Sequence, residues 1–311
     1  MSANLSHSPS PITHPRTIAI IGANGMLAQA VRSTAPESCQ IHCFDLPGFD
    51  MTNRKIVLSI LIELSPEIII NCAAFTDVDE CETQEELASQ VNGDAVGYLA
   101  DAAIATNATL VHISTDYVFP GTGNMPLRED EQVAPESAYG RSKLLGEQAI
   151  LDSDLEKYFI IRTSWLYGIG GNNFVETIVR LAKEREKLGI VSDQIGSPTY
   201  TNDLAAAIFH LLGFSDHPSP VTAPYGIYHF SNEGICSWYD FAVTIVDIAR
   251  KHGEDLKIEQ IAPIKTEDYP LPAKRPGYSV FSKQKYRDAT GMKIPFWWES
   301  LEQYLNVRFK N

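Results

Sequence analysis

The 311-residue sequence has few basic residues and no long hydrophobic segment. Lysine and arginine total 25 against 39 aspartates and glutamates, which gives a formal net charge of −14. Proteins that bind nucleic acid or anionic membrane surfaces need basic patches, so we expect neither partner. No apolar run approaches the roughly 20 residues that a transmembrane helix requires, and we expect no membrane span.

Cysteine is also scarce: the five residues are scattered and odd in number, which argues against a disulfide framework. The first 15 residues are rich in serine and proline and lack an apolar core, so we expect a disordered extension there instead of a secretion signal. These features predict a cytoplasmic protein with reduced thiols. Cys39 and Cys43 flank His42, but the run over residues 39–44 is typical of a short buried strand, and we expect no metal site.

Short β-branched runs alternate with helical patterns in the first half of the chain. We predict strands over residues 17–21, 41–44, 67–71, 109–114 and 158–163, and a helix over residues 87–103, where apolar residues recur every four positions. Alternating strands and helices form right-handed units around a parallel sheet. The predicted fold class is therefore α/β, a Rossmann-type doubly wound parallel sheet with a smaller α/β substrate-binding lobe.

The alternation weakens after residue 168, and prolines and tryptophans gather in the last third. We predict a dinucleotide-binding domain over residues 16–168. Residues 169–311 then form mainly the substrate-binding lobe, with segments near 189–212 and 226–231 returning to the main domain.

The loop after the first predicted strand contains two glycines, Gly22 and Gly25, with Ala28 at the next position of the spacing. Glycines in a strand-to-helix turn let backbone N–H groups approach a pyrophosphate, so we expect Gly22, Asn24, Gly25, Met26 and Leu27 to bind a dinucleotide. An ordinary tight turn is the alternative reading of this short motif.

Two further strand ends fit the same site. Asp45 ends the second predicted strand, where a carboxylate can accept hydrogen bonds from the adenine ribose; a surface turn residue is the alternative. Cys72, Ala73 and Ala74 end the next strand with small side chains that leave room for a cofactor, although such a run also suits plain packing. No arginine follows Asp45 directly, which mildly favours NADH over NADPH.

Tyr139 and Lys143 form a Tyr-x-x-x-Lys motif that opens a helical pattern and places both side chains on one face. A neighbouring ammonium favours phenolate, so we expect Lys143 to shift the pKa of Tyr139 toward neutrality and make it a proton donor to a substrate oxygen. Thr115, at the end of the fourth predicted strand, is a candidate donor to the same oxygen. The alternative is a solvated helix face with an ordinary tyrosine.

Several blocks together resemble the extended short-chain dehydrogenases/reductases and, more closely, the dTDP-4-dehydrorhamnose reductase family. They are the glycine turn, Ser114-Thr115-Asp116-Tyr117-Val118-Phe119, the Tyr139/Lys143 motif, Val78-Asp79-x-Cys81-Glu82, Arg162-Thr163-Ser164-Trp165-Leu166-Tyr167-Gly168, Asn173-Phe174, Asp193-Gln194-x-Gly196-x-Pro198-Thr199, Gly226-x-Tyr228-His229, Ser237-Trp238-Tyr239 and Arg275-Pro276 with Ser279. The resemblance covers roughly residues 17 to 305.

The resemblance implies reduction of the C4 ketone of dTDP-4-dehydro-L-rhamnose by NADPH or NADH. It also implies a catalytic triad of Thr115, Tyr139 and Lys143, with Lys143 holding the nicotinamide ribose. The residues that it places against the nucleotide-sugar are Thr76, Val78, Asp116, Trp165, Asn173 and Arg275.

One departure concerns metal binding. Some bacterial members hold Mg²⁺ through a glutamate shortly after the glycine turn, where this chain has Gln29-Ala30. We therefore expect no metal, and either a monomer or a homodimer. Two other functions remain open: a non-catalytic regulatory subunit of methionine adenosyltransferase, and a related UDP-sugar reductase.

Overall fold

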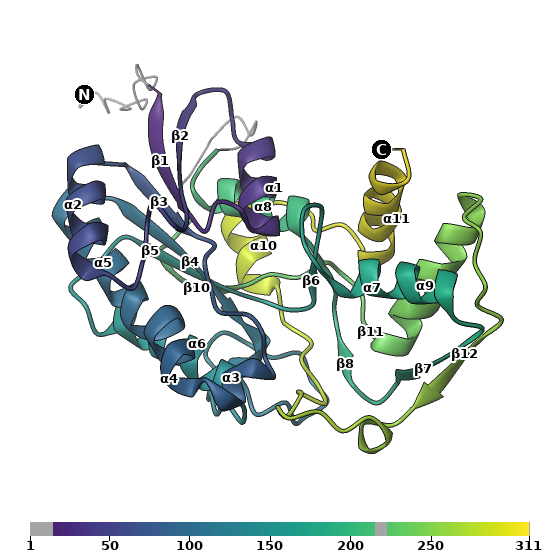
Figure 1. Cartoon of the computed structure of the whole chain (residues 1–311). Helices are drawn as coiled ribbons and strands as arrows, with labels where there is room; N and C mark the ends of the chain where they lie inside the picture. Colours follow the sequence, from purple (N-terminus) through teal and green to yellow (C-terminus); the bar gives the residue numbers. More distant parts are fainter. Residues whose placement is uncertain (1–14, 215–222, 311) are drawn as a thin grey trace, which may run out of the picture.

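A six-stranded parallel sheet forms the larger of two lobes in the computed structural model, which describes residues 15–214 and 223–310 (Figure 1). Its strand order is β10-β5-β4-β3-β1-β2. The strands are β1 (Arg16–Ile21), β2 (Cys39–Phe44), β3 (Ile68–Asn71), β4 (Thr109–Thr115), β5 (Tyr158–Thr163) and β10 (Gly226–His229). The five strands predicted from sequence are confirmed, with ends that differ by one or two residues.

Helices cover both faces of this sheet because its strands are apolar on both sides. Ile18 and Ile20 of β1 pack toward one helical layer, whereas Ala19 and Ile21 pack toward the other. The first layer contains α1 (Met26–Thr34), α8 (Thr201–Leu211) and α10 (Gln284–Thr290); the second contains α2 (Arg54–Leu64), α5 (Ala95–Thr106) and α6 (Ala138–Leu151).

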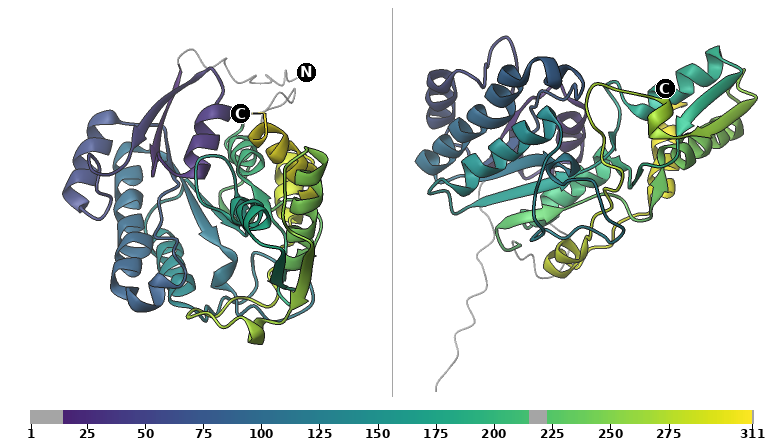
Figure 2. Two further views of the ribbon diagram at one scale, coloured as in Figure 1. Left: turned by 45° about the vertical axis from the view of Figure 1, so that its right-hand side comes forward. Right: turned by 90° about the horizontal axis from the view of Figure 1, so that it is seen from below.

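The second lobe packs three helices around its own core (Figure 2). They are α7 (Phe174–Glu184), α9 (Trp238–Lys251) and α11 (Trp297–Arg308), beside a parallel pair of β7 (Lys187–Val191) and β12 (Gln260–Ile264). The α9 helix begins with a capping box between Ser237 and Asp240. Although α8 and β10 lie far along the sequence, they pack within the main lobe.

Short elements complete the chain. Two short strand pairs are β6 (Leu166–Tyr167) with β9 (Thr199–Tyr200) and β8 (Ile195–Gly196) with β11 (Cys236–Ser237). The remaining helical segments are α3 (Glu80–Thr83), α4 (Glu85–Ser89), η1 (Gln90–Asp94), η2 (Asp116–Val118) and η3 (Thr266–Asp268).

Two local predictions are wrong. The strand over residues 39–44 forms, but it is only half buried and Cys43 is exposed, because β2 is the edge strand and pairs with β1 alone. The predicted helix over residues 87–103 is interrupted by the π-helical turn η1. The side chain of Asn92 in that turn is buried and bonds the backbone of Phe75 and the hydroxyl of Ser142.

The expected N-terminal extension lies outside the described residues, apart from Pro15. Within the ranges that the structure describes, no helix is long and apolar enough to cross a bilayer.

Candidate active site

The strand order positions a crevice at one edge of the sheet. The chain passes from β1 to β2 on one side and later to β3 on the other, and ligands of such sheets bind where the order reverses, beyond the carboxyl ends of the strands. The glycine turn lies at this point. Gly22 has φ +77°, and a Cβ built on it would lie 2.6 Å from the Cα of Ala73, so only glycine fits.

The first turn of α1 is open to an anion. Gly25 occupies the N-cap, and no described side chain caps the helix or places an acidic group in its first turn. The backbone N–H groups at the start of α1, Met26 and Leu27 among them, can therefore receive a phosphate, aided by the helix dipole. These features fit a dinucleotide pyrophosphate.

Asp45 lies directly beside this turn. Its carboxylate accepts hydrogen bonds from the backbone N–H of Asn24 and of Leu46, both at 2.8 Å. The contacts fix the carboxylate at the end of β2, next to the loop that would carry the pyrophosphate. A contact between Asp45 and the adenine ribose stays a prediction.

Cys72, Ala73 and Ala74 follow β3 on the other side of the glycine turn. The Oδ1 of Asn71 accepts a hydrogen bond from the backbone N–H of Ala73 at 3.1 Å and holds this segment against Gly22. Burial raises the pKa of Cys72 to about 12, so its side chain is a small neutral thiol at neutral pH.

The end of β4 and the start of α6 carry Thr115, Tyr139 and Lys143. Thr115 ends β4, and Tyr139 and Lys143 lie one turn apart at the start of α6, whose N-cap Ser137 accepts a hydrogen bond from the N–H of Gly140. The Tyr139 hydroxyl is hydrogen-bonded to Thr115. The Thr115 hydroxyl also donates to Oδ1 of Asp116 at 3.1 Å.

The electrostatics of this group differ from the prediction. Burial raises the pKa of Tyr139 above its ordinary value, and the hydrogen bond with Thr115 lowers it only in part; Lys143 does not shift it toward neutrality. Burial instead lowers the pKa of Lys143 to about 8. The physical reason is that both groups are enclosed, so each favours its uncharged form. Tyr139 is therefore a protonated phenol at neutral pH, which is the form that an acid requires.

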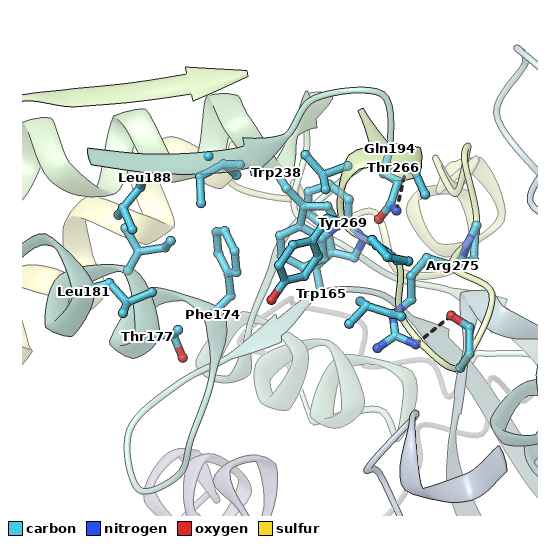
Figure 3. A pocket seen from close by; sticks show the side chains of 18 of the residues that line it. Trp165, Phe174, Thr177, Leu181, Leu188, Gln194, Trp238, Thr266, Tyr269 and Arg275 are labelled. Carbon is cyan, nitrogen blue, oxygen red and sulfur yellow. Dashed lines mark hydrogen bonds between the residues drawn. The ribbon is translucent and has the colours of Figure 1, made fainter. Parts of the chain in front are cut away.

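A cavity of about 700 Å³ is lined by Tyr117 and by residues of the second lobe (Figure 3), and none of Thr115, Tyr139 and Lys143 is in its wall. Its wall contains Trp165 and Trp238, which stack with ring centroids 3.6 Å apart. Trp165 has φ +48°, a conformation that costs a non-glycine residue energy and is concentrated at functional sites. A Cβ on Gly196 would lie 2.8 Å from the Trp165 ring, so this glycine makes room for the stack.

Tyr117 connects the cavity to the catalytic group. It lines the cavity, and its ring lies edge-on to Tyr139 with centroids 5.4 Å apart. The predicted substrate residue Asp116 is buried just behind it. Burial raises the pKa of Asp116 to about 6.

The structure gives Arg275 and Asn173 partners within the chain. Arg275 lines the cavity (Figure 3), yet its guanidinium forms a two-point ion pair with Asp79 at 3.0 and 2.8 Å. Asn173 caps α7, and its Nδ2 donates to the carbonyl of Gly168 at 3.0 Å. Thr76 and Val78 lie in the loop after β3 and are not part of the cavity wall. Substrate contacts for these four residues stay predictions.

Sequence reasoning missed His112, Trp238 and the buried pair Glu147–Arg162. Trp238 belongs to a block that supported the family resemblance but received no role. A polar residue inside the apolar run of β4 was the available signal for His112. The pairing of Glu147 with Arg162 joins α6 to β5 and leaves no local pattern in the sequence.

The described part of the chain holds no cluster of three or more histidine, cysteine, aspartate or glutamate side chains suited to a metal. At the position where the family resemblance suggested a glutamate, Gln29 donates a hydrogen bond to the carbonyl of Asn24 at 2.9 Å. The side chain thus supports the glycine turn.

The chain is similar to known proteins over nearly its whole length. The chain is 40% identical over 293 residues to a dTDP-4-dehydrorhamnose reductase of Aggregatibacter actinomycetemcomitans, covering 93% of this chain and 97% of the relative. It is also 40% identical over 293 residues to the spore coat polysaccharide biosynthesis protein SpsK of Bacillus subtilis, covering 94% of this chain and 97% of that relative. The crystal structure of a dTDP-4-dehydrorhamnose reductase from Bacillus anthracis in complex with NADP superposes with a TM-score of 0.86 at 41% identity, covering 94% and 99%.

These similarities confirm the α/β Rossmann-type fold class and the family resemblance predicted from the sequence. A model of the RmlD substrate binding domain matches residues 16–309, nearly all of the described chain. The chain therefore belongs to the RmlD substrate binding domain family.

Proposed function

We propose that this protein reduces the C4 ketone of dTDP-4-dehydro-L-rhamnose to dTDP-L-rhamnose, with NADPH or NADH as reductant. The observation that carries the proposal is the position of Thr115, Tyr139 and Lys143. Thr115 ends β4 and is hydrogen-bonded to Tyr139, which lies one turn before Lys143 on α6. The uncapped glycine turn follows β1, and Tyr117, whose ring packs against Tyr139, lines the cavity. The full-length similarity to reductases of this name supports the substrate.

The turn residues Gly22, Asn24, Gly25, Met26 and Leu27 would hold the pyrophosphate of the cofactor. Asp45 would contact its adenine ribose, and Cys72, Ala73 and Ala74 would lie along its length. When bound, the reduced nicotinamide supplies the hydride that the carbonyl carbon accepts.

Tyr139 supplies the matching proton. Its buried phenol is protonated at neutral pH and can give that proton to the ketone oxygen, while Thr115 orients the same oxygen by a hydrogen bond. Lys143 lies one turn further along α6 and would hold the nicotinamide ribose. Hydride on carbon and proton on oxygen together convert the ketone to the alcohol.

The cavity has the charge that a nucleoside diphosphate needs. Its charged wall residues are all basic, although the whole protein carries a net charge of −14; they are Arg185, Lys187, Lys274 and Arg275. Within the described residues Arg185 and Lys187 form no ion pair, so their charge is available to a phosphate. The Trp165–Trp238 stack offers an apolar wall beside them.

The same proposal assigns the remaining site residues, the roles of the two lobes, the cellular compartment and the oligomeric state. Asp116, Trp165, Asn173, Arg275, Thr76 and Val78 would contact the nucleotide-sugar. The main lobe over residues 16–168 would serve the dinucleotide, and residues 169–311 mainly the sugar nucleotide. The protein would act in the cytoplasm as a monomer or homodimer.

The decisive test is consumption of reduced cofactor by the purified protein. We expect NADPH or NADH to be oxidised when dTDP-4-dehydro-L-rhamnose is supplied, and not when the sugar is omitted. Equal or faster oxidation with a UDP-4-keto sugar would favour the UDP-sugar reductase. No oxidation with either sugar, together with tight binding to a methionine adenosyltransferase, would favour the regulatory subunit.

A further inference from the structure

Lys143 ends a line of three buried polar side chains that crosses the sheet. Its Nζ lies 3.5 Å from Nε2 of His112 on β4, and Nδ1 of His112 lies 3.1 Å from Nδ2 of Asn71 at the end of β3. Asn71 and His112 face each other in the register of the two strands. All three residues are at most 2% exposed, so water does not substitute for these contacts.

The backbone determines where the proton of His112 resides. The N–H of Ala73 can only donate, and it donates to Oδ1 of Asn71 at 3.1 Å. The Nδ2 of Asn71 is therefore the atom that faces His112, and it donates to Nδ1. A neutral imidazole that accepts at Nδ1 carries its proton on Nε2. The imidazole is neutral because burial, and secondly Lys143, hold the pKa of His112 well below its ordinary value.

The Nε2–H of His112 then points at Lys143. An N–H group cannot accept a hydrogen bond from an ammonium, whereas it can donate to the lone pair of a neutral amine. No carboxylate within the described chain lies at ion-pair distance from Lys143. The carboxylate on the same helix is that of Glu147. It forms an ion pair with Arg162 at 2.7 Å and accepts a hydrogen bond from the hydroxyl of Ser114.

Other charged groups on the elements that pack against α6 are directed elsewhere. Tyr139 and Asp116 act on each other near Thr115. Glu82 of α3 accepts the backbone N–H of Ala138 at 2.8 Å. The other acids are exposed or paired with another arginine: Glu85 with Arg141, Asp101 with Arg54, and the exposed Glu80, Glu86 and Asp94. Glu147 and His112 are thus the charged or titratable groups that act on Lys143.

We propose that Asn71 and His112 form a positioning relay for Lys143: they aim its amine and keep it able to release its proton at the pH of catalysis. The inference rests on the proposed function, because it assigns Lys143 a role in the proton transfers that accompany the reduction. After Tyr139 gives its proton to the substrate oxygen, a phenolate remains. The Lys143 ammonium, one turn further along α6, would supply the proton that restores the phenol and become the neutral amine that Nε2–H of His112 meets. Because Lys143 is buried, we expect solvent to replace its proton only between turnovers, when the ligands have left the site.

One isosteric substitution, Asn71→Asp, should move the proton of His112 from Nε2 to Nδ1. A carboxylate accepts from the Ala73 N–H as before, but it also accepts from Nδ1–H of His112. The proton of the imidazole then moves to Nδ1, and the free Nε2 accepts from the Lys143 ammonium and stabilises it. We expect the alkaline limb of kcat, which reports loss of the Lys143 proton, to lie about one pH unit higher in Asn71→Asp than in the unaltered protein.

Two further variants separate positioning from mere stability. His112→Gln can accept from Asn71 and donate toward Lys143, so it should keep the alkaline limb in place, whereas His112→Leu should lower kcat about tenfold or more and move the limb upward. Asn53→Asp is the matched control, because it adds a carboxylate at the N-cap of α2, where aspartate caps equally well. It should leave the pH profile unchanged.

The direct readout is ¹⁵N NMR of His112, which needs no turnover and so remains valid even if the proposed substrate is wrong. We expect the Nε2–H tautomer in the unaltered protein and the Nδ1–H tautomer in Asn71→Asp. An Nδ1–H tautomer in the unaltered protein would overturn the relay. So would an alkaline limb that stays in place in a folded, active Asn71→Asp variant.

Discussion

Asp79 and Arg275 lie 196 residues apart and form a two-point ion pair that ties the proline-rich segment of the last third to the loop after β3. The same carboxylate accepts the backbone N–H of Ala273 at 3.0 Å. Although burial opposes ionisation, these hydrogen bonds and the arginine hold the pKa of Asp79 below its ordinary value. One acidic side chain thus fixes a wall of the cavity.

Replacing this acid should loosen that wall. We expect Asp79→Asn to speed hydrogen exchange of residues 266–276 and to raise the KM for the nucleotide-sugar. The amide keeps one acceptor oxygen for the Ala273 N–H, but it lacks the charge and the second oxygen that pair with Arg275. Asp130→Asn is the matched control, since it breaks the exposed pair of Arg128 and Asp130, which contributes little. Unchanged exchange over residues 266–276 in Asp79→Asn would show that other contacts hold the segment.

The glycine turn gives a second prediction. Gly22→Ala should lower the free energy of unfolding by about 1–2 kcal/mol for the left-handed backbone alone, and further for the overlap with Ala73. It should also weaken NADPH binding by tenfold or more, measured by fluorescence titration, because the turn must shift.

Gly253 provides the control for that change. It has φ +80°, close to that of Gly22, but a Cβ there would meet no atom within 4 Å. Gly253→Ala should therefore carry the same backbone cost and leave cofactor affinity intact. Equal cofactor binding by both variants would place the dinucleotide away from the turn.

The stacked tryptophans allow a third test. Trp238→Ala removes the partner of Trp165 and should raise the KM for the nucleotide-sugar about tenfold, which corresponds to the free energy of one aromatic contact. Cofactor affinity should not change. Trp298→Ala serves as control, since Trp298 is exposed and stacks on Phe296 outside the cavity wall. If both variants behave alike in steady-state kinetics, the stack has no part in binding.

Lys143 should make stability depend on pH. Its pKa is about 8 in the folded protein and 10.5 in an unperturbed lysine. Between these values the unfolded chain binds more protons, so the free energy of unfolding rises with pH in this window. Relative to Lys143→Met, the unaltered protein should gain about 3 kcal/mol between pH 8 and 10.5 in urea unfolding. Parallel curves for the two proteins would mean that burial does not shift this amine.

The strands and the catalytic motif could be predicted because each is a local pattern. The apolar runs over residues 109–114 and 158–163 mark strands buried on both faces, and Tyr139 and Lys143 share one helix face by spacing alone. The edge position of β2 could not be predicted, because it depends on which strand lacks a second neighbour. The π-helical turn at Asn92 depends likewise on contacts with Phe75 and Ser142.

Contacts between residues far apart in the sequence, and the effects of burial on pKa, could not be predicted from the sequence either. The partner of Arg275 is Asp79, which no spacing rule connects with it. The pKa of Tyr139 was predicted to fall because Lys143 is its neighbour in sequence, yet enclosure by the fold raises it. His112 gained its role only when the sheet register placed it between Asn71 and Lys143.

The central claim is that Tyr139 delivers the proton to the ketone. The most direct measurement is single-turnover oxidation of bound NADPH by dTDP-4-dehydro-L-rhamnose in Tyr139→Phe, with cofactor affinity measured in parallel. The account predicts a rate lower by about 10²–10⁴-fold with unchanged NADPH affinity. A Tyr139→Phe variant that reduces the sugar at the rate of the unaltered protein would contradict it.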